Sequence, residues 1–255
     1  MVRPTHPRRI ASVTGGASGI GLAFAQRWVD DGGAVVLLDL NADAFDDAVE
    51  HLGGPDKARG CTVDVTDARS VAAAFASIAE QEGRLDAAVN CAGIARPAPS
   101  SEVSDKDFVR LVDIHLHGTM RACQAAYPLL KESNGSIVNI SSVAASSGMP
   151  ARASYCASKA GIEGLTRTLA VEWAPDSVRV NAVGPGYTRT ALTEKLMAEG
   201  KLDVSPLVAR TPLGRLADPR EIAAAINFLV SEDASYITGQ SLLVDGGMTV
   251  DGNWY

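Results

Sequence analysis

Short apolar runs alternate with longer stretches of helical period along nearly the whole chain, and this alternation constrains the fold more than any other feature. The runs are "RIASVT", "AVVLLDL", "ARGCTVDV", "LDAAVNCAG", "GSIVNISS", "VRVNAVGPG" and "SLLVDGG". Their continuous Val, Ile, Leu and Ala content is typical of strands buried on both faces of a parallel sheet. Right-handed crossovers between such strands give a doubly wound sheet. We therefore predict an α/β fold whose parallel sheet has about seven strands, with helices on both faces.

The helical stretches between these runs have recognisable starts and stops. They cover residues 19–32, 41–54, 67–83, 104–131, 153–173 and 218–231. The second of them begins at an Asn and ends at a Gly pair, which are typical helix-capping residues. The stretch 187–217 looks irregular. Because the 255 residues contain no repeat, low-complexity tract or linker, we predict a single domain over residues 1–255.

Charge and cysteine content narrow the class of protein. A formal charge of −7 argues against a sequence-independent grip on nucleic acid, so we expect no nucleic-acid partner. No apolar run approaches the roughly 20 residues of a membrane helix, and the basic opening "MVRPTHPRR" leads into no signal-peptide pattern. The four cysteines are scattered without metal-like pairs, so we expect free thiols and no metal. These features predict a cytoplasmic protein.

The segment "TGGASGIG", residues 14–21, joins the first predicted strand to the first helix. Glycines at this place permit a tight turn and a close approach of backbone to a pyrophosphate, and the helix behind them offers free N–H groups. A tight connection without a ligand is the alternative, but the position after the first strand favours a Rossmann-type dinucleotide site. The expected contacts are Gly15, Ser18, Gly19, Ile20 and Gly21.

Asp39 ends the second strand, 18 residues after Gly21. A carboxylate there can accept hydrogen bonds from an adenosine ribose, and its charge would repel a 2′-phosphate. The alternative is an acid that caps the next helix. No compensating charge is expected nearby, since the neighbours are Ala17, Ser18, Leu40 and Asn41. We predict NAD rather than NADP as the cofactor.

Further short motifs follow the glycine turn in order. They are "DV" at 64–65, "NCAG" at 90–93, "SS" at 141–142, "YCASK" at 155–159 and "PGYTRT" at 185–190. With these motifs in this order, the chain resembles the short-chain dehydrogenase/reductase family along nearly its whole length. The resemblance implies an oxidoreductase that acts on a small molecule with a nicotinamide dinucleotide. Because family members are commonly dimers or tetramers, it also implies a homodimer or a homotetramer.

The resemblance assigns further contacts with the cofactor. Asp64 and Val65 would meet the adenine, and Thr188 and Thr190 would help to hold the nicotinamide amide. The other positions of the cofactor cleft would be Asn90, Ala92, Gly93, Tyr155, Lys159, Pro185 and Gly186. Asn90 could equally serve the structure of the strand end alone.

Tyr155 and Lys159 stand four residues apart on a predicted helix and therefore share one face. A free phenol has a pKa near 10, but a nearby ammonium and the positive ring of an oxidised nicotinamide both favour the phenolate. By resemblance, Tyr155 is the general acid/base of hydride transfer. Ser142, 13 residues earlier, would hydrogen-bond the substrate oxygen. For the pair alone, two surface residues on an ordinary helix would be the simpler interpretation.

The string "IHLHGT", residues 114–119, departs from the family pattern, which has Asn where this chain has His115. In the family that Asn is associated with a distortion of the long helix. An imidazole could occupy its place and donate one hydrogen bond, and when unperturbed it titrates near pH 6.5. Either His115 preserves the backbone role alone, or it joins the proton path and adds a pH dependence. We expect His117 at the surface or in a subunit contact.

The resemblance also implies a mobile flap over the substrate, here at residues 187–215. Apolar side chains could form a substrate wall there beside Ser142 and Tyr155, or simply pack the flap: Met149, Tyr187, Leu192 and Leu196. Arg96 and Arg152 could contact a polar or anionic substrate, or be ordinary surface residues. The aromatic tail at 248–255 ends in Trp254 and Tyr255, which we expect to pack on a neighbouring subunit or near its pocket.

The sequence thus predicts an NAD(H)-dependent dehydrogenase that interconverts a secondary alcohol and a ketone. A polyol or sugar alcohol, a hydroxysteroid and a small secondary alcohol all remain open as substrates. One alternative is a reductase of 3-oxoacyl thioesters, against which Asp39 counts because such enzymes usually prefer NADP. The other is a non-catalytic dinucleotide-binding sensor on the same fold, against which the set Ser142, Tyr155 and Lys159 counts.

Overall fold

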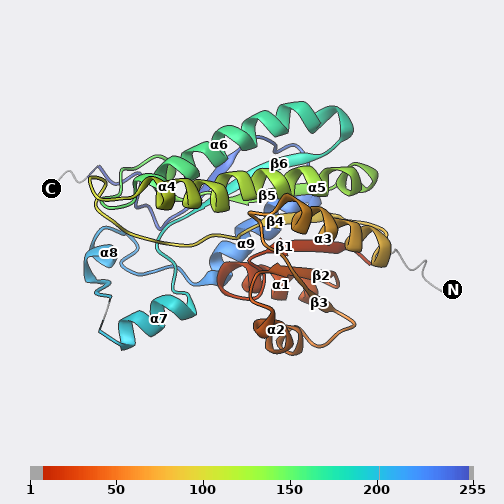
Figure 1. Ribbon diagram of the computed structural model, residues 1–255, viewed down its shortest axis with the longest axis horizontal. Helices are drawn as coiled ribbons and strands as arrows, with labels where there is room; N and C mark the ends of the chain where they lie inside the picture. Colours follow the sequence, from red (N-terminus) through yellow and green to blue (C-terminus); the bar gives the residue numbers. More distant parts are fainter. Residues whose placement is uncertain (1–7, 201, 253–255) are drawn as a thin grey trace.

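Seven parallel strands form one sheet in the order β3-β2-β1-β4-β5-β6-β7 (Figure 1). The computed structural model describes residues 8–200 and 202–252, and at positions 191, 192, 195 and 196 the backbone only. The strands are β1 (Ile10–Thr14), β2 (Ala34–Asp39), β3 (Ala58–Thr62), β4 (Ala87–Asn90), β5 (Ser136–Ile140), β6 (Arg179–Pro185) and β7 (Ser241–Val244). The predicted fold class is confirmed, including the parallel pairing of every neighbouring strand.

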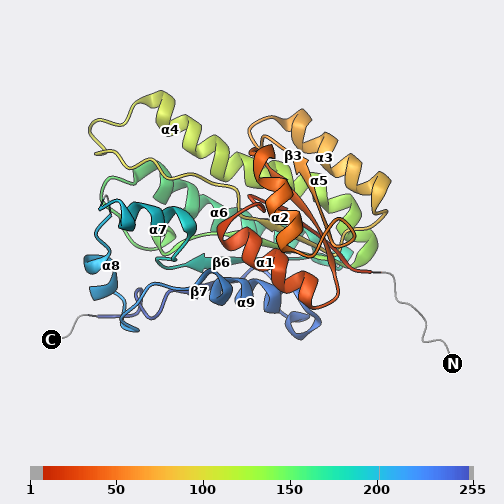
Figure 2. The ribbon, with the colours of Figure 1, turned by 90° about the horizontal axis from the view of Figure 1, so that it is seen from below.

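Helices cover both faces of this sheet (Figures 1 and 2). One face packs against α1 (Gly19–Asp30), α2 (Phe45–His51) and α9 (Pro219–Val230), and the other against α3 (Ala68–Gln81), α5 (Gly118–Ser133) and α6 (Ala153–Trp173). Short 3₁₀ turns cover Ala42–Ala44, Val143–Ala145, Ala174–Asp176 and Glu232–Ala234. The layers therefore follow the doubly wound arrangement that the alternation of runs predicts.

Successive side chains of β2 enter two different cores. Val35 and Leu37 belong to the core under α1, α2 and α9, whereas Val36 and Leu38 belong to the core under α3, α5 and α6. Alternate residues of a strand point to opposite faces, so a strand covered on both sides must be apolar at every position. This is why "AVVLLDL" reads as one continuous apolar run.

Two segments differ from the expectation. The predicted helix 104–131 is a continuous helical segment in which α4 (Asp105–Val112) leads through a π-helical turn, η2 (Asp113–His117), into α5. A π turn carries one extra residue per turn and is frequent at functional sites. The stretch 187–217 is not wholly irregular, since it contains α7 (Ala191–Ala198) and α8 (Ser205–Ala209). That this stretch acts as a flap stays a prediction.

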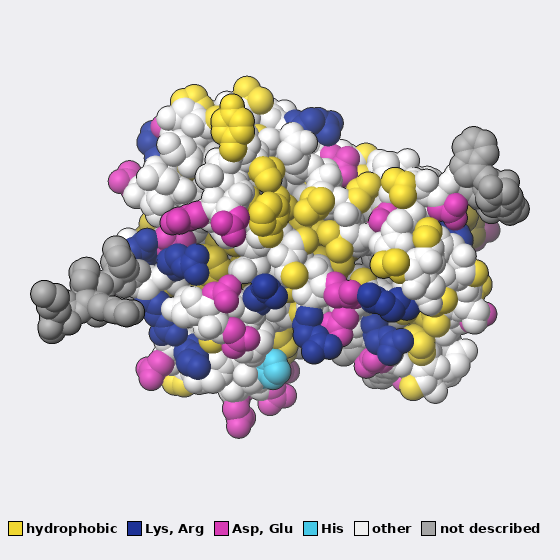
Figure 3. All heavy atoms as spheres, turned by 180° about the vertical axis from the view of Figure 1, so that it is seen from behind, with side chains coloured by type: hydrophobic (Ala, Val, Ile, Leu, Met, Phe, Trp, Pro, Cys, Tyr) yellow, Lys and Arg dark blue, Asp and Glu magenta, His cyan; other side chains and the backbone are white. Residues whose placement is uncertain are grey.

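Large apolar side chains are exposed at several places on the described surface, one of which is the β7 edge of the sheet. Exposed Phe228 lies on α9, and Leu242 and Leu243 lie on the edge strand β7. The face behind the view of Figure 1 shows hydrophobic side chains through its middle, between charged ones (Figure 3). Within residues 8–200 and 202–252, no helix has the length and apolar character needed to cross a membrane.

Candidate active site

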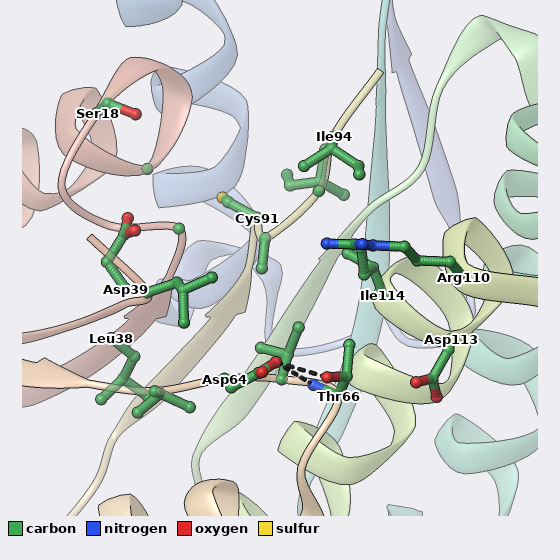
Figure 4. A pocket seen from close by; sticks show the side chains of 18 of the residues that line it. Ser18, Leu38, Asp39, Asp64, Thr66, Cys91, Ile94, Arg110, Asp113 and Ile114 are labelled. Atoms are coloured by element: carbon green, nitrogen blue, oxygen red, sulfur yellow. Dashed lines mark hydrogen bonds between the residues drawn. The ribbon is translucent and has the colours of Figure 1, made fainter. Parts of the chain in front are cut away.

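A cavity of about 750 Å³ opens at the carboxyl ends of the strands. Doubly wound folds bind ligands there, outside the point at which the strand order reverses. One wall consists of the glycine turn and the end of β2, and the other of α4 and η2 (Figure 4). Eleven residues expected to bind the cofactor line it: Gly15, Ser18, Gly19, Ile20, Gly21, Asp39, Asp64, Val65, Ala92, Gly93 and Thr190.

The glycine turn is built in a way that only glycine permits. Gly15 and Gly19 have φ values of 65° and 55°, in the left-handed region that L side chains rarely adopt. A Cβ atom at Gly21 would lie 2.4 Å from the Gly15 carbonyl oxygen. The backbone is therefore folded back on itself at the start of α1, leaving an open wall where a phosphate can approach the helix N–H groups.

Asp39 lies on the same wall as the turn (Figure 4). Its Oδ2 atom accepts a hydrogen bond from the Ala17 N–H at 3.2 Å, and its Oδ1 atom accepts one from the Asn41 N–H at 3.1 Å. These bonds tie the carboxylate to the glycine turn and fix its direction. Each oxygen retains lone pairs for the hydroxyls of a ribose.

Asp64 forms the floor of the cavity at the end of the β3 segment. Its Oδ1 atom accepts hydrogen bonds from the Thr66 N–H and hydroxyl, at 2.9 and 2.7 Å (Figure 4). These bonds hold the pKa of Asp64 below its ordinary value, and the nearby charges of Arg110 and Arg121 lower it further. Asp64 is therefore an ionised acceptor at neutral pH.

The sequence does not predict the wall formed by α4 and η2. Lys106, Val109, Arg110, Asp113 and Ile114 line the cavity at spacings of three and four residues, which is one face of a helix. That spacing was visible in the sequence. Which helix lies across the cleft from the glycine turn depends on the tertiary fold, and the sequence gives no local signal for it.

Several expected cofactor residues do not line this cavity. Asn90 is buried in the sheet, where its Nδ2 atom donates to Asn139 Oδ1 at 2.9 Å, in keeping with the structural alternative. The others are Tyr155, Lys159, Pro185, Gly186 and Thr188. Gly186 instead lines a separate small cavity of about 80 Å³ together with Tyr187, and the Thr188 hydroxyl donates to the Gly186 carbonyl at 3.2 Å.

Ser142 and Tyr155 come together beyond the end of β5. Ser142 is buried and caps a 3₁₀ turn, and its Oγ atom accepts a hydrogen bond from the Ala144 N–H at 3.1 Å. Burial raises the pKa of Tyr155 above its ordinary value, while a hydrogen bond with Ser142 and the charge of Arg152 act against this rise. Ser142 and Tyr155, both expected to contact the substrate oxygen, therefore lie close to each other.

Lys159 lies beneath the Tyr155 ring, with Nζ 5.6 Å from the ring centroid. It is buried, and Nζ donates a hydrogen bond to the Ile140 carbonyl at 2.6 Å. Burial lowers the pKa of Lys159 to about 8, and neighbouring Cys91 acts in the opposite sense. From the sequence, Lys159 and an oxidised nicotinamide are expected to lower the pKa of the phenol. In this structure the opposing groups are instead Ser142 and Arg152.

His115 is buried in the π-helical turn, between Tyr155 and the loop at residues 91–94 that lines the cavity (the cavity loop). Its Nε2 atom lies 2.8 Å from the Ile94 carbonyl oxygen, so we assign the proton to Nε2, which donates this bond. Its Nδ1 atom is the one buried side-chain nitrogen or oxygen without a hydrogen-bond partner in the described part of the chain. Burial, and next the charge of Lys159, lower the pKa of His115 to about 4, so the ring is neutral at neutral pH.

The expected substrate residues are only partly described. Met149 and Tyr187 are half-buried, and Tyr187 lies close enough to Tyr155 to act on its pKa. The side chains of Leu192 and Leu196 and the residues Trp254 and Tyr255 lie outside the described residues. His117 is exposed, as expected, and its Nδ1 lies 3.2 Å from Asp113 Oδ1.

The two candidate arginines differ in their surroundings. Arg96 forms an ion pair with Asp107 at 3.3 Å. Arg152 is half-buried at the start of α6, three residues before Tyr155. It follows Ala151, whose φ of 60° is unusual for a residue with a side chain and whose carbonyl accepts a bond from the Ala98 N–H at 3.0 Å. Arg152 is thus the arginine whose charge reaches the phenol.

A glycine-lined wall, a carboxylate at the end of β2 and a Ser–Tyr–Lys group define an oxidoreductase site of the dinucleotide-binding α/β class. A family profile described as enoyl-(acyl carrier protein) reductase matches residues 15–249. The chain belongs to the short-chain dehydrogenase/reductase family, whose members use a nicotinamide dinucleotide. The open glycine wall, which a Cβ at Gly21 would disrupt, fits such a cofactor.

Curated relatives are similar to the chain over most of their length. A D-threitol dehydrogenase of Mycolicibacterium smegmatis is 42% identical, over 95% of this chain and 93% of the relative. A 3-oxoacyl-(acyl-carrier-protein) reductase of Thermotoga maritima is 37% identical, over 95% and 98%. A 3α-hydroxysteroid dehydrogenase of Mediterraneibacter gnavus is 38% identical, over 93% and 96%. The solved structure of a short-chain type dehydrogenase/reductase from Mycobacterium ulcerans has a TM-score of 0.89 at 33% identity, covering 95% of this chain and 90% of that one.

Proposed function

We propose that the protein is an NAD(H)-dependent oxidoreductase that interconverts a secondary alcohol and a ketone. The observation that carries this proposal is the group of buried Ser142, half-buried Tyr155 and buried Lys159 beside a dinucleotide-sized cavity. The residues that would hold the cofactor are those of the glycine turn, Asp39, the Asp64 floor and the loop at 92–93. When bound, the nicotinamide accepts a hydride from a carbinol carbon or returns one to a carbonyl carbon.

Tyr155 handles the proton of this reaction. In oxidation its phenolate removes the proton from the alcohol, and in reduction its hydroxyl returns a proton to the carbonyl oxygen. Lys159 is held beneath the ring by its bond to the Ile140 carbonyl, and the charge that favours the phenolate in this structure is that of Arg152.

Ser142 orients the substrate oxygen. Because its Oγ already accepts a bond from the Ala144 N–H, its own hydrogen is directed elsewhere, to Tyr155 or to a substrate. A hydroxyl that donates to the substrate oxygen stabilises the charge that develops there in the transition state.

NAD is the proposed cofactor because of Asp39. Its carboxylate is tied to the glycine turn through the Ala17 N–H, and a 2′-phosphate beside it would meet a fixed negative charge. A KM for NADP as low as that for NAD would contradict this part of the proposal.

Reduction of a 3-oxoacyl thioester is the second candidate, and the similarity to the Thermotoga maritima reductase favours it. Similarities to a threitol dehydrogenase and a hydroxysteroid dehydrogenase favour the first candidate. Their sequence identities to this chain, 42% and 38%, are close to the 37% of the reductase. The choice between them therefore depends on a direct assay.

The test is a panel assay that follows absorbance of the reduced nicotinamide. The protein is mixed with NAD or NADP and with polyols, hydroxysteroids, simple secondary alcohols or 3-hydroxyacyl thioesters. We expect turnover with NAD and one of the alcohols. Tyr155→Phe should lower kcat by about 10² to 10⁴, with NADH binding intact. Binding of NADH without turnover on any substrate would indicate the non-catalytic sensor instead.

We further propose a homodimer or homotetramer located in the cytoplasm. The exposed Leu242 and Leu243 on the edge strand β7 support assembly, because an apolar edge strand is commonly covered by a second chain. Light scattering coupled to size-exclusion chromatography measures the state. A monomer at micromolar concentration would contradict it.

A further inference from the structure

Two cations of α4 face the dinucleotide cavity. Lys106 and Arg110 are four residues apart, so they lie on one face of the helix, and both line the cavity. In Figure 4 the Arg110 side chain extends from α4 into the cavity, while Ser18 and Asp39 lie on the opposite wall. They are the only Lys or Arg residues among the described residues that line this cavity.

In the part of the chain that the structure describes, neither side chain forms a hydrogen bond or an ion pair, although the charge of Arg110 acts on Asp64 and lowers its pKa. Three of the acids that line the cavity are held by other groups. Asp39 is held by backbone N–H groups, and Asp64 is held by Thr66. Asp113 forms an ion pair with Arg121 at 2.8 Å. The positive charges of Lys106 and Arg110 are therefore available to a ligand in the cavity.

The opposite wall carries no cationic side chain. The turn "TGGASGIG" contains no Lys or Arg, so it offers backbone N–H groups and the dipole of α1 alone. A dinucleotide carries two negative charges on its diphosphate. A guanidinium reaching across the cavity can bind such oxygens in a bidentate way, and an ammonium adds a point charge beside it.

We propose that Arg110, supported by Lys106, binds the diphosphate of the dinucleotide from the wall opposite the glycine turn. This inference rests on the proposed function, because it concerns the same cofactor. It assigns to α4 a part of the binding energy that the resemblance motifs do not include. Lys106 precedes Arg110 by one helical turn and contributes the smaller effect.

The experiment measures binding without turnover, by titration calorimetry on the full chain. The probes are ADP-ribose, ADP, adenosine and 2′-phospho-ADP-ribose. For Arg110→Gln we expect the affinity for ADP-ribose and ADP to fall about tenfold, and the affinity for adenosine to stay unchanged. Arg110→Lys should recover part of the loss. Arg69→Gln, which removes an equal charge from an exposed side chain of α3 outside the cavity, should change none of these affinities.

The outcomes separate this inference from the proposed function. An unchanged affinity for ADP and ADP-ribose in Arg110→Gln would overturn the inference and leave the proposed function intact. A loss confined to 2′-phospho-ADP-ribose would also overturn it, and would count against NAD as the cofactor. A wild-type chain that binds none of the probes would overturn both proposals.

Discussion

The imidazole ring of His115 meets the phenol ring of Tyr155 edge-on, with centroids 5.3 Å apart and ring planes at 88°. This is a favourable geometry for two aromatic rings. The other side of the imidazole is fixed by the bond from Nε2 to the Ile94 carbonyl. His115 therefore connects the cavity loop to the proposed acid/base, and does so from within the π-helical turn.

We expect His115 to help to position Tyr155 and not to titrate between pH 5 and 8. Since burial lowers its pKa to about 4, the ring stays neutral from pH 5 upward. We expect His115→Asn to leave the shape of the pH–rate profile unchanged between pH 5 and 8, with kcat within about tenfold, because Asn can still donate one hydrogen bond. If the pH–rate profile of the wild type changes slope near pH 6.5 and that of His115→Asn does not, the imidazole takes part in proton transfer.

Gly93 and His115 should be coupled energetically. A Cβ atom at Gly93 would lie 2.4 Å from Cε1 of His115, so Gly93→Ala forces the ring to move and should cost about 1–3 kcal/mol of unfolding free energy. In the His115→Ala background this cost should largely vanish, because the clashing ring is gone. Urea unfolding of both single variants and the double variant measures the coupling. Additive losses would contradict it.

We expect Arg152 to lower the pKa of the Tyr155 phenol. Its charge acts to lower the pKa of Tyr155, so Arg152→Gln should raise that pKa. In alcohol oxidation the phenolate is the active form, and the rise of kcat/KM with pH should therefore move to higher pH. Arg96→Gln is the matched control, because Arg96 is paired with Asp107 and should leave the midpoint in place. A midpoint that stays or falls in Arg152→Gln would reject the assignment.

Asp39 should decide the choice of cofactor. Asp39→Asn keeps the size of the side chain and an oxygen for the Ala17 N–H, and removes the charge. We expect the ratio of kcat/KM for NADP to that for NAD to rise by at least about tenfold. A ratio that does not change would mean that the carboxylate serves only to hold the glycine turn.

The sequence was sufficient for features that depend on local pattern. The apolar run of β2 predicts a strand covered on both faces, and the spacing of Tyr155 and Lys159 predicts a shared helix face, because periodicity alone determines which way side chains point. The glycine turn was equally readable, since the left-handed conformations of Gly15 and Gly19 leave few other residues possible there.

Features that depend on which elements meet were not readable. Arg110 lies 71 residues after Asp39 in the sequence, and only the packing of α4 brings both to one cavity. The pKa of His115 is a second case. The sequence alone suggests the ordinary value for an imidazole, whereas the fall to about 4 results from burial and the charge of Lys159 in the folded chain. The π-helical turn differs from these cases, because the resemblance to the family implies a distortion of the long helix at His115.

Lys159 should make the stability of the protein without cofactor depend on pH in the alkaline range. In the folded chain burial lowers its pKa to about 8, whereas in the unfolded chain it keeps its ordinary 10.5. Between these two values the unfolded chain holds a proton that the folded chain has released, so the unfolding free energy rises with pH in that window. The gap between the two pKa values corresponds to about 3 kcal/mol.

Comparison with Lys159→Met isolates this contribution, because the other groups that titrate at high pH are common to both proteins. The unfolding free energy of the variant minus that of the wild type should be largest below pH 8 and should fall by up to about 3 kcal/mol by pH 10.5. Urea unfolding at a series of pH values measures the difference. If it is constant across the window, the ammonium is not destabilised by burial. Lys159 would then be fully protonated at every pH at which the proposed reaction runs, and its charge beneath Tyr155 would be permanent.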